Sequence, residues 1–150
     1  MRKKILIHGY GNPGREDDGL GPELAERIEK LEIEGVATDA DYQLNIEDAV
    51  ALSEYDIVLF VDASREDGDR LTLRRVKAAP EIAFTSHSVS PESILAICED
   101  HFQASPETWL LGIAGYSFEM AEGLTPRARE NLEDAVKHVQ SMIKRWKEQL

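Results

Sequence analysis

The sequence contains one run that decides the fold class: residues 56–62 (DIVLFVD) place five consecutive apolar residues between two aspartates. A continuous apolar run of this length is typical of a parallel strand that is buried on both faces. Shorter apolar runs at 4–8, 82–86 and 109–113 predict further strands, and residues 35–39 predict a weaker one. Because a strand buried on both faces needs cover on both sides, these runs indicate helices above and below one sheet.

Segments with helical spacing alternate with these strands. Leucine and isoleucine recur every three or four positions over residues 20–31, and Asn45 is in a position to cap a short second helix. Ser90 and Thr125 are each followed by proline, which combines an N-cap with the residue favoured at the first helical position. Residues 71–76 alternate and predict a strand at the sheet edge. The last helix carries one apolar face, formed by Leu132, Ala135, Val136, Val139, Ile143 and Trp146.

The alternation predicts an α/β protein, a three-layer α/β/α sandwich with a mostly parallel central sheet. The length suits one domain over residues 1–150, and the net charge of −12 disfavours nucleic acid and anionic membranes as partners. Cys98 is the single cysteine, which excludes an internal disulfide and suits a reducing compartment. The apolar run near the N-terminus is too short for a signal peptide, and no stretch approaches the roughly 20 apolar residues of a membrane helix. We therefore expect a cytoplasmic protein.

Charged side chains stand where three of the expected strands end. The first strand is followed by Asp17 and Asp18, the central run ends at Asp62, and the 82–86 run leads to His87. Sites in parallel α/β sheets form outside the carboxyl ends of the strands. Two carboxylates and one imidazole suit a divalent transition metal such as nickel or zinc, and three protein ligands leave positions open for water or substrate. The sequence therefore predicts a metal site at this edge.

Each of these residues also has a simpler interpretation. Asp17 or Asp18 can cap the helix that follows, Asp62 can close a turn, and His87 can be an ordinary packed side chain. His8 is expected in the core, and neither it nor the two remaining histidines is assigned a role.

Two other functions fit parts of the sequence. Residues 9–14 (GYGNPG) match the G-x-G-x-x-G pattern of nucleotide-binding loops, but the acids at 16–18 would face a bound pyrophosphate. An acid pair after the first strand and an aspartate after a central strand also occur in signalling receiver modules. A receiver needs a lysine at the end of its fifth strand, where this sequence has residues 113–116 (IAGY).

A set of short motifs runs through nearly the whole chain in a fixed order: GYGN at 9–12, DDGLG at 17–21, VDA at 61–63, HSVSP at 87–91, GI at 112–113, FE at 118–119 and EGLTP at 122–126. Each motif is short, but their ordered combination resembles the nickel–iron hydrogenase maturation endopeptidases. Glu16 departs from the pattern, where a small residue is expected.

The resemblance implies a hydrolase, an aspartyl-type endopeptidase with an α/β/α sandwich fold. It implies that the substrate is the precursor of a nickel–iron hydrogenase large subunit, from which a short C-terminal extension is removed after nickel insertion. The family's metal-contacting residues fall on Asp18, Asp62 and His87, with Asp17 as the alternative to Asp18. The nickel would be supplied by the substrate, with no organic cofactor. The catalytic nucleophile stays unassigned, with the same three residues as candidates.

Overall fold

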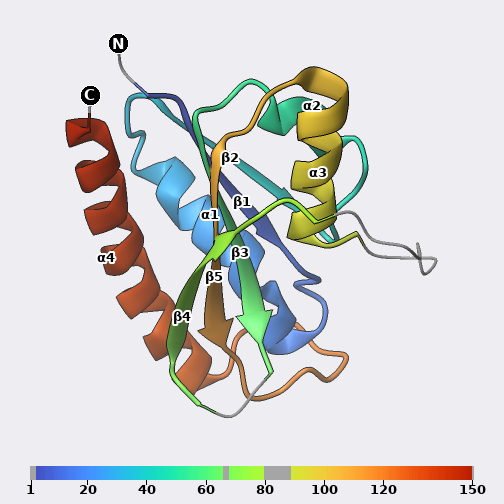
Figure 1. The fold of residues 1–150 in the computed structure, drawn as a ribbon. Coiled ribbons are helices and arrows are strands. Elements are labelled where there is room, and N and C mark those ends of the chain that lie inside the picture. Colours follow the sequence, from blue (N-terminus) through green and yellow to red (C-terminus); the bar gives the residue numbers. More distant parts are fainter. Residues whose placement is uncertain (1–2, 66–67, 80–88, 150) are drawn as a thin grey trace.

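A five-stranded sheet forms the centre of the molecule, in the order β2-β1-β3-β5-β4 (Figure 1). The computed structural model describes residues 3–65, 68–79 and 89–149. Strands β2, β1, β3 and β5 are parallel to one another, and β4 pairs antiparallel with β5 at the edge of the sheet. Their bounds are Ile5–Tyr10 for β1, Val36–Asp41 for β2, Ile57–Ser64 for β3, Leu71–Val76 for β4 and Glu107–Ala114 for β5.

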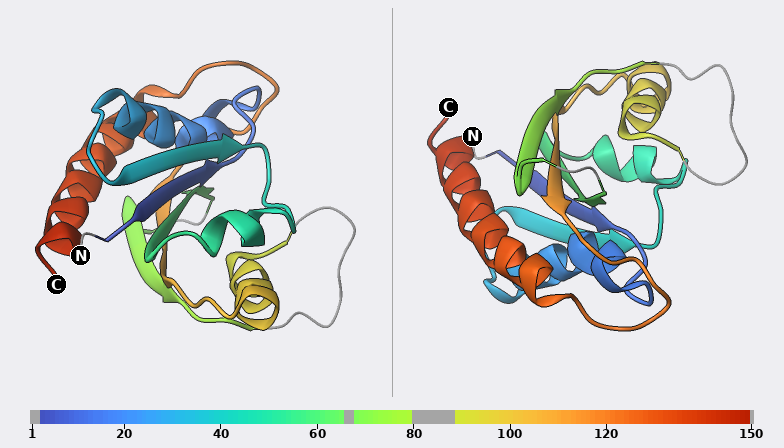
Figure 2. Two further views of the ribbon diagram at one scale, coloured as in Figure 1. Left: turned by 90° about the horizontal axis from the view of Figure 1, so that it is seen from above. Right: turned by 90° about the horizontal axis from the view of Figure 1, so that it is seen from below.

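Helices cover both faces of the sheet (Figure 2). One face packs against α1 (Leu20–Lys30) and α4 (Pro126–Glu148), and the other against α2 (Asp48–Leu52) and α3 (Pro91–Phe102). A 3-10 helix, η1 (Glu16–Gly19), directly precedes α1. Alternate residues of the central strand β3 face opposite layers, because side chains in a strand alternate between its two faces. The three-layer α/β/α sandwich with a mostly parallel sheet is therefore confirmed.

The strongest local signals gave the right elements. Ser90 accepts a hydrogen bond from Ser93 N at 3.2 Å to cap α3, and Thr125 accepts one from Ala128 N at 3.3 Å to cap α4. The six apolar residues expected on one face of α4 are all buried. Residues 71–76 form the expected edge strand, β4. Local capping and periodicity decided these elements because each depends on residues only a few positions apart.

The expected cap at Asn45 is wrong. The second helix begins at Asp48, and the Asn45 side chain instead donates to Asp41 Oδ2 at 3.3 Å and to Gln43 O at 3.4 Å. The strand expected at 82–86 lies outside the described residues. No described helix is both long enough and apolar enough to cross a membrane.

Candidate functional site

Close contacts between backbone segments explain the glycines of the first loop. A Cβ atom at Gly9 would lie 2.0 Å from the carbonyl oxygen of Gly21, and one at Gly21 would lie 2.5 Å from Val61 O. Gly11 has a φ of +142°, and its Cβ would lie 2.0 Å from Asp18 O. The glycines let the start of α1 pack directly on β1 and β3. The same contacts place η1 and its acids at the carboxyl ends of these strands.

Asp17 points into the protein and is fully buried. Its carboxylate accepts hydrogen bonds from the backbone N–H groups of Tyr116 at 2.8 Å, Ser117 at 3.2 Å and Thr125 at 2.8 Å. The Thr125 hydroxyl donates a fourth, at 2.7 Å. We call this group, Asp17 with Tyr116, Ser117 and Thr125, the buried junction. It holds the segment between β5 and α4 against η1, so Asp17 has a structural role.

Asp18 and Asp62 instead line one open cavity of about 460 Å³ at the carboxyl ends of the strands. Asp18 Oδ2 accepts a hydrogen bond from Asn12 N at 2.8 Å, and Asp62 Oδ1 accepts one from Ala63 N at 2.8 Å. We call this the carboxylate cavity; its lining consists of Asp18, Asp62, Ala63, Ser64, Arg65, Thr72, Arg74, Leu110 and Gly112. Between the two adjacent acids of the sequence, it is Asp18 that shares a cavity with Asp62.

The register of three strands builds the floor of the carboxylate cavity. Asp62 on β3 pairs with Gly112 on β5, which in turn pairs with Thr72 on β4. Gly112 leaves the space open, because a Cβ atom there would lie 2.6 Å from the Thr72 hydroxyl oxygen and 3.6 Å from Ser64 Cβ. Arg74, two residues further along β4, ion-pairs with Glu92 Oε1 at 2.7 Å at the start of α3.

Burial makes Asp62 the chemically distinctive carboxyl group of the cavity. Its pKa is raised from 3.8 to about 6, first by burial and then by the neighbouring Asp18 carboxylate. The Ala63 N–H, the Tyr10 hydroxyl and Arg65 act in the opposite direction, without cancelling the shift. Burial and the proximity of Asp62 also raise the pKa of the Tyr10 hydroxyl. A carboxyl group with a pKa near 6 can exchange a proton near neutral pH, and a cation placed between Asp18 and Asp62 would relieve their repulsion.

The structure thus brings together two of the three residues that the sequence singled out. Asp18 and Asp62 meet at one cavity, whereas His87 lies outside the described residues. Sequence reasoning missed Tyr10 and Arg74, which come from separate strands. The alternation of residues 71–76 could have suggested Arg74, since it places Thr72 and Arg74 on one face of β4, but nothing local pointed to Tyr10.

Several solved structures share this architecture. The NiFe hydrogenase maturation protease HycI from Thermococcus kodakarensis has a TM-score of 0.76 at 21% identity, over 95% of this chain and 94% of that one. The hydrogenase maturating endopeptidase HybD from Escherichia coli has a TM-score of 0.74 at 21% identity, over 95% of this chain and 93% of that one. The hydrogenase 2 maturation peptidase from a Thaumarchaeota archaeon has a TM-score of 0.71 at 21% identity, over 95% of this chain and 99% of that one. The chain has the hydrogenase maturation protease fold.

The likeness lies in the structure rather than in the sequence as a whole. No family model matches the chain, and no curated protein sequence matches it. The maturation-protease fold agrees with the family that the short ordered motifs resemble.

The same geometry disfavours the two rival functions. Asp18 already occupies the N–H of Asn12 in the glycine loop, in the place where a nucleotide phosphate would need free N–H donors. A receiver module has the strand order 2-1-3-4-5. The described strands here follow β2-β1-β3-β5-β4, with an antiparallel edge strand.

Proposed function

We propose that this chain is a hydrogenase maturation endopeptidase that removes the C-terminal extension of a nickel-loaded large-subunit precursor. The observation that carries the proposal is the meeting of Asp18 and Asp62 at one cavity of a maturation-protease fold. The resemblance of the ordered motifs supports the same function from an independent direction. The proposal keeps the cytoplasmic location that the sequence analysis expects.

Asp18, Asp62 and His87 are the proposed ligands of the nickel ion that the precursor carries. The donor set fits, because carboxylate and imidazole ligands bind divalent nickel, and three of them leave room for ligands from the precursor itself. Both carboxylates line the same cavity, and the negative charge of Asp18 disfavours the ionised form of Asp62. A bound cation would remove this repulsion. A precursor that carries nickel would therefore gain binding energy that a nickel-free precursor lacks.

The peptide bond is proposed to be hydrolysed by water, with a carboxylate as the proton acceptor. The pKa of Asp62 is about 6 in the metal-free protein. With one carboxylate oxygen on the nickel, the other oxygen of Asp62 would be the proton acceptor of this step. The attacking water would transfer a proton to Asp62 as its oxygen bonds to the amide carbon, and Asp62 would return that proton to the amide nitrogen as the C–N bond breaks, which releases a carboxylate and an amine. This assignment corresponds to an aspartyl-type endopeptidase.

The test is a cleavage assay with nickel-loaded and nickel-free precursor, each with and without a chelator, read by the mass of the product. We expect the purified protein to contain little nickel, to cut the loaded precursor in mild chelator, and to leave the nickel-free precursor intact. Asp18→Asn and Asp62→Asn should abolish cutting, whereas Glu133→Gln, on the exposed face of α4, should not. Efficient cutting of the nickel-free precursor would refute the recognition step. Failure to cut either precursor would refute the proposed activity.

A further inference from the structure

A second group of potential ligands lies on β1, β2 and α2. His8 on β1 pairs in register with Asp39 on β2 and with Phe60 on β3, and its side chain is fully buried. Neither ring nitrogen of His8 has a hydrogen-bond partner among the residues that the structure describes. Buried polar atoms are nearly always satisfied by protein, water or an ion, so this imidazole needs an explanation.

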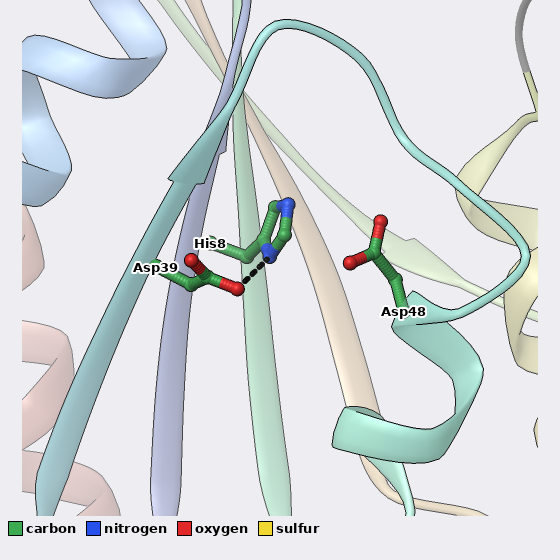
Figure 3. Close-up of side chains that lie close together, drawn as sticks. All are labelled: His8, Asp39 and Asp48. Atoms are coloured by element: carbon green, nitrogen blue, oxygen red, sulfur yellow. Dashed lines mark ion pairs between the residues drawn. The ribbon is translucent and has the colours of Figure 1, made fainter.

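Two carboxylates flank the His8 ring. Figure 3 shows the imidazole between Asp39 and Asp48, the first residue of α2. Asp39 Oδ2 lies 3.7 Å from His8 Nδ1, which is too long for a hydrogen bond. One ligand atom from each of the three residues lies within 4.8 Å of the others.

Each carboxylate has one oxygen already used by the backbone and a second that remains for a ligand. Asp39 Oδ1 accepts from Ala40 N at 2.9 Å, and Asp48 Oδ2 accepts from Asn45 N at 2.8 Å. These hydrogen bonds fix the orientation of both side chains, as backbone donors do for carboxylates that bind metals. The cluster is therefore more than a group of exposed acids, because a buried and unpartnered imidazole points into it.

The donor set selects the class of ion. One imidazole and two carboxylates suit zinc or a similar divalent transition metal, whereas calcium and magnesium prefer oxygen ligands alone. Zinc binds such atoms at about 2.0–2.2 Å, which places tetrahedral ligand atoms about 3.3–3.5 Å apart. The three ligand atoms need to close by at most about 1.5 Å, which rotation of the half-exposed Asp39 side chain and of Asp48 can supply.

We propose that His8, Asp39 and Asp48 form a zinc site that ties α2 to β1 and β2. The ion satisfies one His8 nitrogen and neutralises two carboxylates at once. It also joins three elements that are separated in sequence, so its binding stabilises the fold.

This site is distinct from the carboxylate cavity. His8 on β1 pairs with Phe60 on β3, and Phe60 pairs in turn with Leu110 on β5, which lines the carboxylate cavity. Two strand spacings, about 10 Å, thus separate the backbone of His8 from that of Leu110. Metal binding at the two places can therefore be measured separately.

The experiment uses the full chain with Asp62→Asn and His87→Ala, which removes two of the proposed nickel ligands, after extraction of metals with a chelator. Native mass spectrometry should show one zinc ion bound. A hundredfold excess of zinc over its dissociation constant should raise the melting temperature by on the order of 5 °C. Adding Asp39→Asn or Asp48→Asn should weaken zinc binding at least tenfold. Asp41→Asn is the matched control, because Asp41 is an exposed acid at the end of the same strand, and it should leave zinc binding unchanged.

Nitrogen NMR of the imidazoles gives a second measurement that does not depend on variants. The coordinated His8 nitrogen should shift when zinc is added, and the shift should saturate at one equivalent. Absence of bound zinc in the parent would overturn the proposal, as would an unmoved His8 resonance. Equal zinc affinity in the Asp39→Asn, Asp48→Asn and Asp41→Asn proteins would also overturn it, and would leave an ordinary His8–Asp39 ion pair as the explanation.

Discussion

Asp17 and Asp18 are adjacent in sequence but lie in two different environments. The Asp17 carboxylate is buried and fully hydrogen-bonded, whereas the Asp18 carboxylate lines an open cavity. In the buried junction, Asp17 accepts four hydrogen bonds from one segment of the chain. In the carboxylate cavity, Asp18 accepts one from Asn12 N and otherwise faces open space beside Asp62. A carboxylate surrounded by N–H donors holds structure together, whereas one with few donors beside a second acid is available to bind a cation.

The short 3-10 helix produces this separation. Successive residues of a 3-10 helix are rotated by about 120° around its axis, so neighbours point in different directions. Asp17 is thereby directed toward the segment that follows β5, and Asp18 toward the glycine loop and β3. The pair of acids that looks like one feature in the sequence is two features in the structure.

The largest expected effect is on stability, at Asp17. An Asp17→Asn amide retains one acceptor oxygen and places an NH2 donor among N–H donors. We expect the free energy of unfolding to fall by about 3–5 kcal/mol, measured by urea denaturation. Asp18→Asn, the adjacent control, should change it by less than about 1 kcal/mol. Equal losses in the two variants would show that the regions do not differ as described.

The second-largest expected effect is on the rate of precursor cleavage, and it comes from substitutions in the carboxylate cavity. Asp18→Asn and Asp62→Asn should each reduce cleavage of nickel-loaded precursor at least a hundredfold, because each removes charge from the proposed ligand set. That factor corresponds to about 2.7 kcal/mol of lost transition-state stabilisation. Thermal melting should show both variants folded. Retention of full activity by either one would remove that residue from the site.

A smaller effect concerns the pH dependence of stability in the metal-free protein. Because the pKa of Asp62 rises from 3.8 to about 6 on folding, the folded state holds this proton more tightly. The contribution is therefore fully favourable below about pH 4 and is lost as pH rises through 6, with a total of about 2–3 kcal/mol. Asp62→Asn should flatten this part of the profile and be the more stable protein at pH 8. Urea denaturation of both proteins in chelator between pH 4 and 8 checks this, and parallel profiles would contradict it.

The smallest effect separates the two functions of Thr125. Its hydroxyl donates to Asp17 and also accepts from Ala128 N as the cap of α4. Thr125→Val loses both bonds and should lower the free energy of unfolding by about 1–2 kcal/mol. Thr125→Ser keeps the hydroxyl and should remain within about 0.5 kcal/mol of the parent. If the serine variant were as unstable as the valine variant, the methyl group rather than the hydrogen bonds would be responsible.

The sequence by itself determined the layers, the buried strands at 4–8, 56–62 and 109–113, and the two helices that begin with proline. These features depend on periodicity and on caps, which are encoded within a few residues of each other. It also placed Asp62 near the carboxyl end of the central strand, where the apolar run stops, although β3 continues to Ser64. The helix start at Asn45 was wrong because the Asn45 side chain turns back to Asp41 and the Gln43 carbonyl, and the helix begins only at Asp48.

Only the tertiary structure decided what the polar residues do. The choice of Asp18 over Asp17 as the partner of Asp62 depends on the segment between β5 and α4, about a hundred positions away, which takes up Asp17. The placement of Thr72 and Arg74 in the cavity depends on the antiparallel pairing of β4 with β5. The meeting of His8 with Asp39 and Asp48 depends on strand register and on where α2 begins. Contacts of this kind join residues far apart in the chain, so a local pattern can name the candidates, but only packing decides which of them touch.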